Sequence, residues 1–175
     1  MTTIGVVGLN YWGPNLVRNF DGLAQLTWLC DLDDAHLGPL AERYPHARAT
    51  NAFADMLADD ALDAVVIATP VPTHYTLAKQ ALEAGKHVFV EKPPAMRAVE
   101  MDELVQLAAD RDRVLMPGHL LLYHPAVLKL KELVASGELG DVLCVYGNRV
   151  NLGIVRSNEN ALWSLGVHEI GRAHV

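Results

Sequence analysis

Residues 4–13 have the sequence IGVVGLNYWG, a short apolar run followed by a turn with two glycines. An apolar run of this length that leads into a glycine turn is typical of a buried parallel strand. The turn nearly matches the pattern G-x-G-x-x-G, with Asn10 where the second glycine belongs. Asparagine enters the left-handed backbone region more readily than most residues, so the turn can survive this change. The stretch predicts a strand–turn–helix unit in which Gly8 permits the tight turn and Gly13 permits close helix packing.

The alternation of strands and helices continues outward from this turn. Apolar strands are predicted at 4–7, 26–32, 64–68, 87–90 and 114–116. Helices are predicted at 11–20, 33–44, 73–84 and 98–110, with a short helix that ends at Leu57 after an N-cap at Thr50 or Asn51. Strict alternation of this kind predicts an α/β fold, a doubly wound parallel sheet with right-handed crossovers.

The pattern changes after Gly118. A helix is predicted at 125–135, a long strand at 142–152 and a helix at 161–170. We expect a first domain at 1–118 and the incomplete start of a second α/β domain at 119–170, because a whole domain usually needs about 100 residues or more. Residues 171–175 resemble a translated sequencing adapter and are expected to be non-native. The chain is then expected to be a fragment of a longer protein.

The composition narrows the classes of function. Hydrophobic residues make up 51% of the 175 residues and charged residues 20%, which is typical of a globular chain. The net charge of −7, with no long basic run, disfavours a nucleic-acid or membrane-surface partner. The sequence shows no signal peptide and no membrane-spanning segment, and Cys30 and Cys144 lack metal-ligand spacing. We therefore expect a cytoplasmic protein with no metal site, whose two cysteines are reduced packing residues.

Asp31 connects the glycine turn to a dinucleotide. It lies at the end of the second predicted strand, about 20 residues after the glycines, where an acidic side chain binds the ribose hydroxyls of NAD. Its charge would repel the 2′-phosphate of NADP, and Leu32 beside it offers no positive partner. Asp33 and Asp34 have a simpler interpretation as helix caps. A plain strand-to-helix turn is the alternative for the glycine motif alone, but strand, turn, helix and acid together favour NAD over NADP.

Two further loops follow apolar strands at the same edge, where open α/β sheets bind ligands. Their sequences are IATPVPTH at 67–74 and GKHVFVEKP at 85–93. Together with VGLNYWG at 7–13 and SGELGDV at 136–142, these segments resemble the glucose–fructose oxidoreductase/inositol dehydrogenase (Gfo/Idh/MocA) family in order and spacing. The resemblance implies an NAD(P)-binding Rossmann domain and a second α/β domain that carries the substrate. It also implies hydride transfer at a carbinol carbon of a sugar, nucleotide sugar or cyclitol.

The resemblance also implies roles for individual residues. The expected cofactor contacts come from the turn, the acid and the two loops: Gly8, Asn10, Tyr11, Trp12, Gly13, Asp31, Thr69, Pro70, His74, Glu91 and Lys92. Lys92 corresponds to the family's active-site lysine, beside the nicotinamide and the substrate hydroxyl. Burial and a positive neighbour favour the neutral amine of a lysine, which can then accept the hydroxyl proton. A surface salt bridge with Glu91 is the simpler alternative for Lys92, and His74 could equally be a packing residue.

The segment 148–170, NRVNLGIVRSNENALWSLGVHEI, resembles a nucleotide-sugar-oxidising branch of the family. His168 would be the active-site histidine, and Arg156 and Asn160 would contact the substrate. Ser164 stands where the family usually has an aspartate. On a helix, residues i and i+4 share a face, so Ser164 could still bond the substrate that His168 contacts, but without charge. Loop polarity is the alternative interpretation of Arg156 and Asn160.

We therefore expect an NAD-dependent dehydrogenase with a small-molecule sugar or nucleotide-sugar substrate, a homo-oligomer when full length. An NAD-sensing protein without catalysis is one alternative, which Ser164 favours slightly. A fragment without an active site is another.

Overall fold

The computed structural model describes residues 1–144, 146 and 166. The chain forms two compact units, 1–118 and 119–175. The first unit contains one six-stranded sheet in the order β3-β2-β1-β4-β5-β6, and each strand pairs with its neighbours in parallel. The strands are β1 (Thr3–Val7), β2 (Gln25–Cys30), β3 (Arg48–Thr50), β4 (Ala64–Ile67), β5 (His87–Val90) and β6 (Leu115–Pro117).

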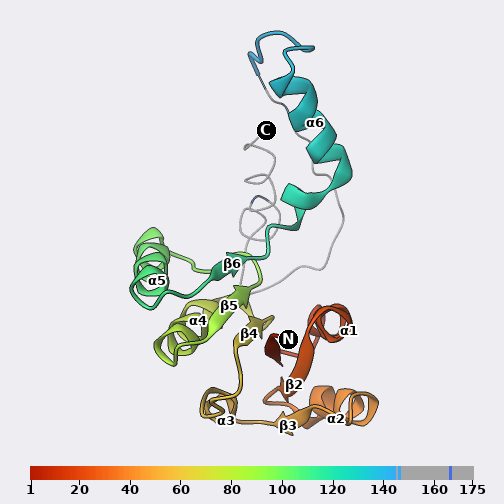
Figure 1. Ribbon diagram of the computed structural model, residues 1–175, viewed down its shortest axis with the longest axis vertical. Coiled ribbons are helices and arrows are strands. Elements are labelled where there is room, and N and C mark those ends of the chain that lie inside the picture. Colours follow the sequence, from red (N-terminus) through yellow and green to blue (C-terminus); the bar gives the residue numbers. More distant parts are fainter. Residues whose placement is uncertain (145, 147–165, 167–175) are drawn as a thin grey trace. The chain divides into compact units, whose positions relative to one another are not determined.

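Helices connect successive strands of the sheet. They are α1 (Gly13–Leu23), α2 (Asp34–Arg43), α3 (Phe53–Leu57), α4 (His74–Glu83) and α5 (Ala98–Asp110), and the 3-10 turn η1 (Val71–Thr73) precedes α4. In Figure 1, α1 and α2 lie on one side of the strands, and α3, α4 and α5 lie on the other. The doubly wound parallel sheet that the sequence predicts is confirmed.

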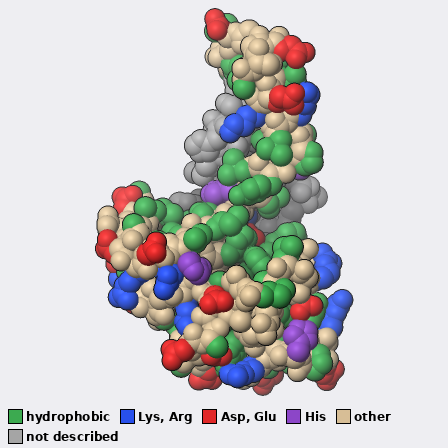
Figure 2. Space-filling model, viewed as in Figure 1, with side chains coloured by type: hydrophobic (Ala, Val, Ile, Leu, Met, Phe, Trp, Pro, Cys, Tyr) green, Lys and Arg blue, Asp and Glu red, His purple; other side chains and the backbone are tan. Residues whose placement is uncertain are grey.

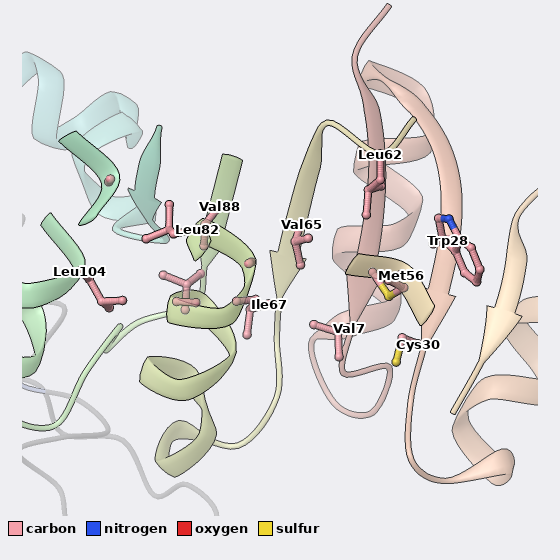
Figure 3. Packing of buried hydrophobic residues seen from close by; sticks show 14 residues of the cluster. Val7, Trp28, Cys30, Met56, Leu62, Val65, Ile67, Leu82, Val88 and Leu104 are labelled. Carbon is pink, nitrogen blue, oxygen red and sulfur yellow. The ribbon is translucent and has the colours of Figure 1, made fainter. Parts of the chain in front are cut away.

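Two hydrophobic clusters cover the two faces of the sheet, because successive side chains of a strand point to opposite sides. On β1, Val6 packs with α1 and α2, whereas Val7 packs with α3, α4 and α5. Figure 3 shows the second cluster, in which Met56 of α3, Leu82 of α4 and Leu104 of α5 cover the strands. Burial of both faces explains why β1 and β4 are almost uninterrupted apolar runs.

The direction in which successive strands are added to the sheet reverses between β1 and β4. The chain builds outward from β1 to β3 and then returns to build from β4 to β6. Ligands of open α/β sheets bind outside the carboxyl ends of the strands at such a point. The loops after β1, β2, β4 and β5 are therefore the segments of interest.

Several predicted elements differ from the observed ones. The strand β3 was not predicted, because three residues at a sheet edge, mostly exposed, carry no apolar pattern. The predicted N-cap of α3 at Thr50 or Asn51 is wrong: the cap is Ala52, and Thr50 ends β3 while its hydroxyl accepts the Ala52 backbone N–H at 3.0 Å. The predicted strand over 142–152 is wrong at 142–144 and 146, which pair with no strand, and its remainder lies outside the described residues.

In the second unit, η2 (Leu120–Tyr123) leads into α6 (Pro125–Ala135), whose bounds match the prediction. Exposed apolar side chains such as Tyr123 and Leu128 lie on these elements, and Figure 2 shows green side chains over this part of the chain. On the same view, acidic and basic side chains are mixed over the first unit. Most of the predicted helix over 161–170 lies outside the described residues. Within the described part of the chain, no helix has the length and apolarity needed to cross a bilayer.

The two cysteines differ from each other. Cys30 is buried in the core, and burial together with the charges of Asp31 and Asp55 raises the pKa of its thiol to about 11. Cys30 is therefore an un-ionised packing residue, as expected. Cys144 is exposed, so the expectation that it packs in a core is wrong.

Candidate functional site

Backbone hydrogen bonds align the loops that follow four strands at one edge of the sheet. The backbone N–H of Gly8 donates to the carbonyl of Cys30 at 2.9 Å, and that of Ala68 donates to Val7 at 2.8 Å. The N–H of Glu91 donates to Ile67 at 2.9 Å. The parallel pairing thus continues one residue beyond the strands. It holds the starts of the glycine turn, the β4 loop and the β5 loop side by side.

The glycine turn is shaped by contacts that no larger residue would allow. Gly8 has a φ of 90°, and a Cβ there would lie 2.6 Å from Ala68 C and Thr69 N. A Cβ on Gly13 would overlap the carbonyl oxygen of Gly8. Gly8 therefore lies against the β4 loop, and the first residue of α1 lies against Gly8. These are the two uses of glycine that the motif predicts.

Asn10, Tyr11 and Trp12 form the exposed crest of the turn. Tyr11 has 71% and Trp12 has 44% of its surface exposed, whereas Gly13 behind them is buried. Polar and aromatic groups of the crest are thus accessible to a ligand that approaches the amino end of α1. Their contact with a cofactor stays a prediction.

Asp31 follows β2 directly and holds the glycine turn. Its Oδ2 accepts the backbone N–H of Leu9 at 2.6 Å, and its Oδ1 accepts that of Asp33 at 2.9 Å. The side chain keeps 12% of its surface exposed. Each carboxylate oxygen has a second lone pair, so Asp31 can accept ribose hydroxyls as well as the two backbone N–H groups.

His36 is a neighbour of this carboxylate that sequence reasoning missed. Its Nδ1 lies 3.5 Å from Asp31 Oδ1 and 3.9 Å from Asp33 Oδ2. The signal was available, because His36 falls in the first turn of α2, the helix that begins shortly after Asp31. Beyond it, the Asn51 side-chain amide donates to the Asp31 carbonyl at 3.0 Å and to the Asp34 carboxylate at 2.8 Å.

The β4 loop is closed by hydrogen bonds around Thr69 and His74. The Thr73 hydroxyl donates to the Pro70 carbonyl at 2.8 Å, and its oxygen lies 2.7 Å from Thr69 Oγ1, whose hydroxyl can donate to it. Pro70 is exposed and Thr69 is partly buried. His74 has 1% of its surface exposed. Its Nε2 lies 2.6 Å from the Thr69 carbonyl oxygen, and its Nδ1 lies 2.8 Å from that of Pro93. A direct contact between His74 and a cofactor stays a prediction, and the contacts described here are to backbone.

Glu91 and Lys92 follow β5, next to the β4 loop. The Glu91 carboxylate accepts the Lys92 backbone N–H at 3.3 Å, and a Cβ on Gly118 would lie 3.1 Å from its Oε1. Burial raises the pKa of Glu91, although the Lys92 backbone N–H, the Lys92 charge and a hydrogen bond from the Trp12 side chain act in the opposite direction. Lys92 is itself partly buried, and its peptide bond to Pro93 is cis.

Arg156, Asn160, Ser164 and His168 lie outside the described residues. Among the residues that the structure describes, no three His, Cys, Asp or Glu side chains are grouped so that they could hold a metal ion.

Comparison with known proteins decides the family. Residues 2–119 match the Gfo/Idh/MocA model, described as an oxidoreductase family with an NAD-binding Rossmann fold. The chain belongs to the Gfo/Idh/MocA family. The resemblance seen in the sequence is thereby confirmed, together with the NAD-binding Rossmann fold.

Three relatives illustrate the Gfo/Idh/MocA family. UDP-N-acetylglucosamine 3-dehydrogenase of Acidithiobacillus ferrooxidans is 32% identical over 128 residues, which are 73% of this chain and 40% of that protein. The structure of GenD2 from gentamicin A biosynthesis, in complex with NAD, is 33% identical with a TM-score of 0.75 and covers 78% of this chain and 40% of its own. The structure of scyllo-inositol dehydrogenase from Lactobacillus casei, with NAD(H) and scyllo-inositol bound, is 28% identical with a TM-score of 0.75 and covers 81% and 43%.

The chain spans between about a third and about half of the length of the curated relatives that it matches.

Proposed function

We propose that this chain is the cofactor-binding part of an NAD-dependent dehydrogenase that oxidises a secondary hydroxyl of a sugar, nucleotide sugar or cyclitol. The observation that best supports it is the alignment of the glycine turn, Asp31 and the Glu91–Lys92 loop at one edge of the sheet. Relatives named for UDP-N-acetylglucosamine and for inositol share this Rossmann domain. Their names support a polyhydroxylated substrate class without choosing among its members.

The residues present fit a dinucleotide. A Cβ on Gly8 or Gly13 would collide with the chain's own backbone, so these two glycines allow the tight turn and the close packing of α1 that the first and third glycines of a Rossmann turn provide. Asp31 would hold the adenosine ribose through the lone pairs that Leu9 and Asp33 leave open. Backbone and side-chain groups at Asn10, Tyr11, Trp12, Thr69 and Pro70 would complete the binding surface. When bound, NAD supplies the acceptor for the hydride.

Lys92 would act on the substrate hydroxyl. Loss of hydride from a carbinol carbon requires loss of the hydroxyl proton as well, and an amine can accept it only when neutral. Partial burial of Lys92 favours that neutral form. Glu91 would hold the lysine backbone through its carboxylate and keep water away from the loop by its own burial.

The remaining substrate contacts would come from the second unit. We propose that residues 119–170 begin the substrate domain, and that Arg156, Asn160, Ser164 and His168 contact the substrate there. His168 would share the proton path with Lys92, and Ser164 would only hydrogen-bond the substrate. The full-length protein would be a homo-oligomer that acts on a small molecule.

The experiment uses this chain and the full reading frame that contains it. Calorimetry on the chain should show NAD binding, and the full-length protein should form NADH with members of a panel of sugars, nucleotide sugars and inositols. NAD binding with no turnover on any member of the panel would instead favour the NAD-sensing alternative. Absence of NAD binding would contradict the proposal at its first step.

A further inference from the structure

The unusual feature of the candidate site is the ring of His74, which faces two carbonyl oxygens. Nδ1 lies 2.8 Å from the Pro93 oxygen and Nε2 lies 2.6 Å from the Thr69 oxygen. Both distances are those of hydrogen bonds. A carbonyl oxygen only accepts, so each ring nitrogen has to donate. A neutral imidazole carries one N–H and would set a lone pair against the other oxygen.

We propose that His74 is a doubly protonated positioning residue that ties the lysine loop after β5 to the loop after β4. The residue has 1% of its surface exposed, so water cannot take the place of either carbonyl. The cost of burying the charge is offset by two charge-assisted hydrogen bonds, which are about twice as strong as neutral ones. The amino end of α4, at which His74 stands, disfavours a cation here.

The bond to Pro93 bears directly on Lys92. The proline ring fixes φ of Pro93, so its ψ is the soft torsion that remains between the lysine and the next peptide. A hydrogen bond that fixes the Pro93 carbonyl therefore fixes this torsion. The backbone of Lys92 is held from this side by His74 and from the other by the Glu91 N–H bond to Ile67.

The bond to Thr69 extends the same constraint to the glycine turn. The Ala68–Thr69 peptide is the group against which Gly8 packs, since a Cβ on Gly8 would lie 2.6 Å from two of its atoms. His74 thus connects the β5 loop to the peptide that supports the glycine turn. One buried ring sets the relative position of the two segments that would hold the two ends of the reaction, the cofactor and the general base.

The first test observes the ring itself in the ¹⁵N-labelled chain, without a ligand and at neutral pH. A long-range ¹H–¹⁵N spectrum should show both ring nitrogens of His74 as N–H nitrogens. His87 is the matched control in the same unit, because its Nδ1 accepts the Val114 backbone N–H at 3.0 Å and must lack a proton. A His74 spectrum with one bare nitrogen, like that of His87, would overturn the double protonation.

The second test measures amide hydrogen exchange in His74→Gln, which keeps a donor for only one carbonyl. Exchange at Glu91 and Lys92 should be faster by roughly tenfold or more, which corresponds to about 1.4 kcal/mol, while Val6 in the sheet centre changes little. The control His87→Gln should leave Glu91 and Lys92 unchanged. Equal acceleration at Val6 and Lys92 would mean global destabilisation and would overturn the positioning role.

The ring spectrum needs no variant, so the proposal stays falsifiable if His74→Gln folds poorly. The role of His74 in turnover rests on the proposed function. The ring spectrum and the amide exchange are independent of that function, because neither measurement uses a substrate. In the full-length enzyme, His74→Gln should lower kcat by about tenfold or more with a smaller change in KM for NAD. A loss of NAD affinity with an unchanged kcat would overturn the assignment to the lysine loop.

Discussion

The carboxylate of Asp31 accepts the backbone N–H of Leu9 at 2.6 Å, across 22 residues of sequence. The acidic residue that would select the cofactor is therefore also a support of the glycine turn. A hydrogen bond to a charged group contributes roughly 1.5–3 kcal/mol. Changes at Asp31 should consequently affect the affinity for every dinucleotide, and not only the choice between NAD and NADP.

The unmodified chain should bind NAD more tightly than NADP. Asp31 and Asp33 place negative charge at the end of β2, and a 2′-phosphate would be repelled there. Dissociation constants measured by calorimetry for the two dinucleotides provide the comparison. Equal or tighter binding of NADP would remove Asp31 from the ribose site.

Asp31→Asn should weaken NAD binding by roughly tenfold, because the amide keeps only one accepting oxygen for the Leu9 and Asp33 N–H groups, and a tenfold change is about 1.4 kcal/mol. The penalty against NADP should shrink at the same time. Asp33→Asn is the matched control: its side chain is 59% exposed and caps α2 through the Ala35 N–H. The control should change NAD affinity much less, and an equal effect of both variants would refute a special role for Asp31.

Two glycines of α1 should respond to alanine in opposite directions. Gly13→Ala places a Cβ on the Gly8 carbonyl oxygen, so the unfolding free energy should fall by about 1–3 kcal/mol and NAD binding should be lost. A Cβ at Gly22 meets nothing within 4 Å, so Gly22→Ala should raise stability by roughly 0.5–1 kcal/mol. Thermal and denaturant unfolding measure both, and a stable Gly13→Ala variant with normal NAD affinity would contradict the packing role of Gly13.

Most of the sheet could be predicted from the sequence because it is built from local patterns. β5, α5 and α6 were predicted to the residue, since each has an apolar period bounded by a clear stop such as Gly85 or Gly137. β3 was missed because an exposed edge strand of three residues needs only a neighbour, and its pairing with β2 is a tertiary property.

The site was predictable by its position in the fold and less so by its contacts. The loops after β1, β2, β4 and β5 were expected at one edge, because the carboxyl ends of parallel strands share it. The double use of Asp31 and the two carbonyls around His74 could not be foreseen. These contacts join Leu9 to Asp31 and His74 to Pro93, which are 22 and 19 positions apart in the sequence, and they lie in loops that have no periodic pattern.

Glu91 should make stability fall as pH rises above its ordinary pKa. Burial raises its folded pKa above the ordinary value of 4.5, so the folded state binds more protons than the unfolded state in that interval. The contribution of Glu91 is therefore complete below pH 4.5 and is lost as pH rises through the folded value. Glu91→Gln removes this titration, and its stability relative to the unmodified chain should increase across the same window.

Glu103 gives the control of opposite sign. Hydrogen bonds from Lys79 and Tyr75 lower its pKa, so its contribution is present above 4.5 and is lost as pH falls. Glu103→Gln should therefore lose stability relative to the unmodified chain as pH rises. Denaturant unfolding over a pH series checks both, and parallel curves for the two variants would show that Glu91 is not destabilised by its burial.

Lys92 should be the side chain whose removal costs the most turnover in the full-length enzyme. It follows β5 at the carboxyl edge, next to the β4 loop, and its backbone is held by Glu91. Loss of a general base typically lowers the rate by about 10²–10⁴-fold, so Lys92→Ala should lose NADH formation to that extent while NAD affinity changes much less. Lys79→Ala, which removes an amine on α4 that pairs with Glu103, is the control and should keep its rate. Near-normal turnover in Lys92→Ala would move the base to His168. A loss of NAD affinity in proportion to the rate would make Lys92 a binding residue instead.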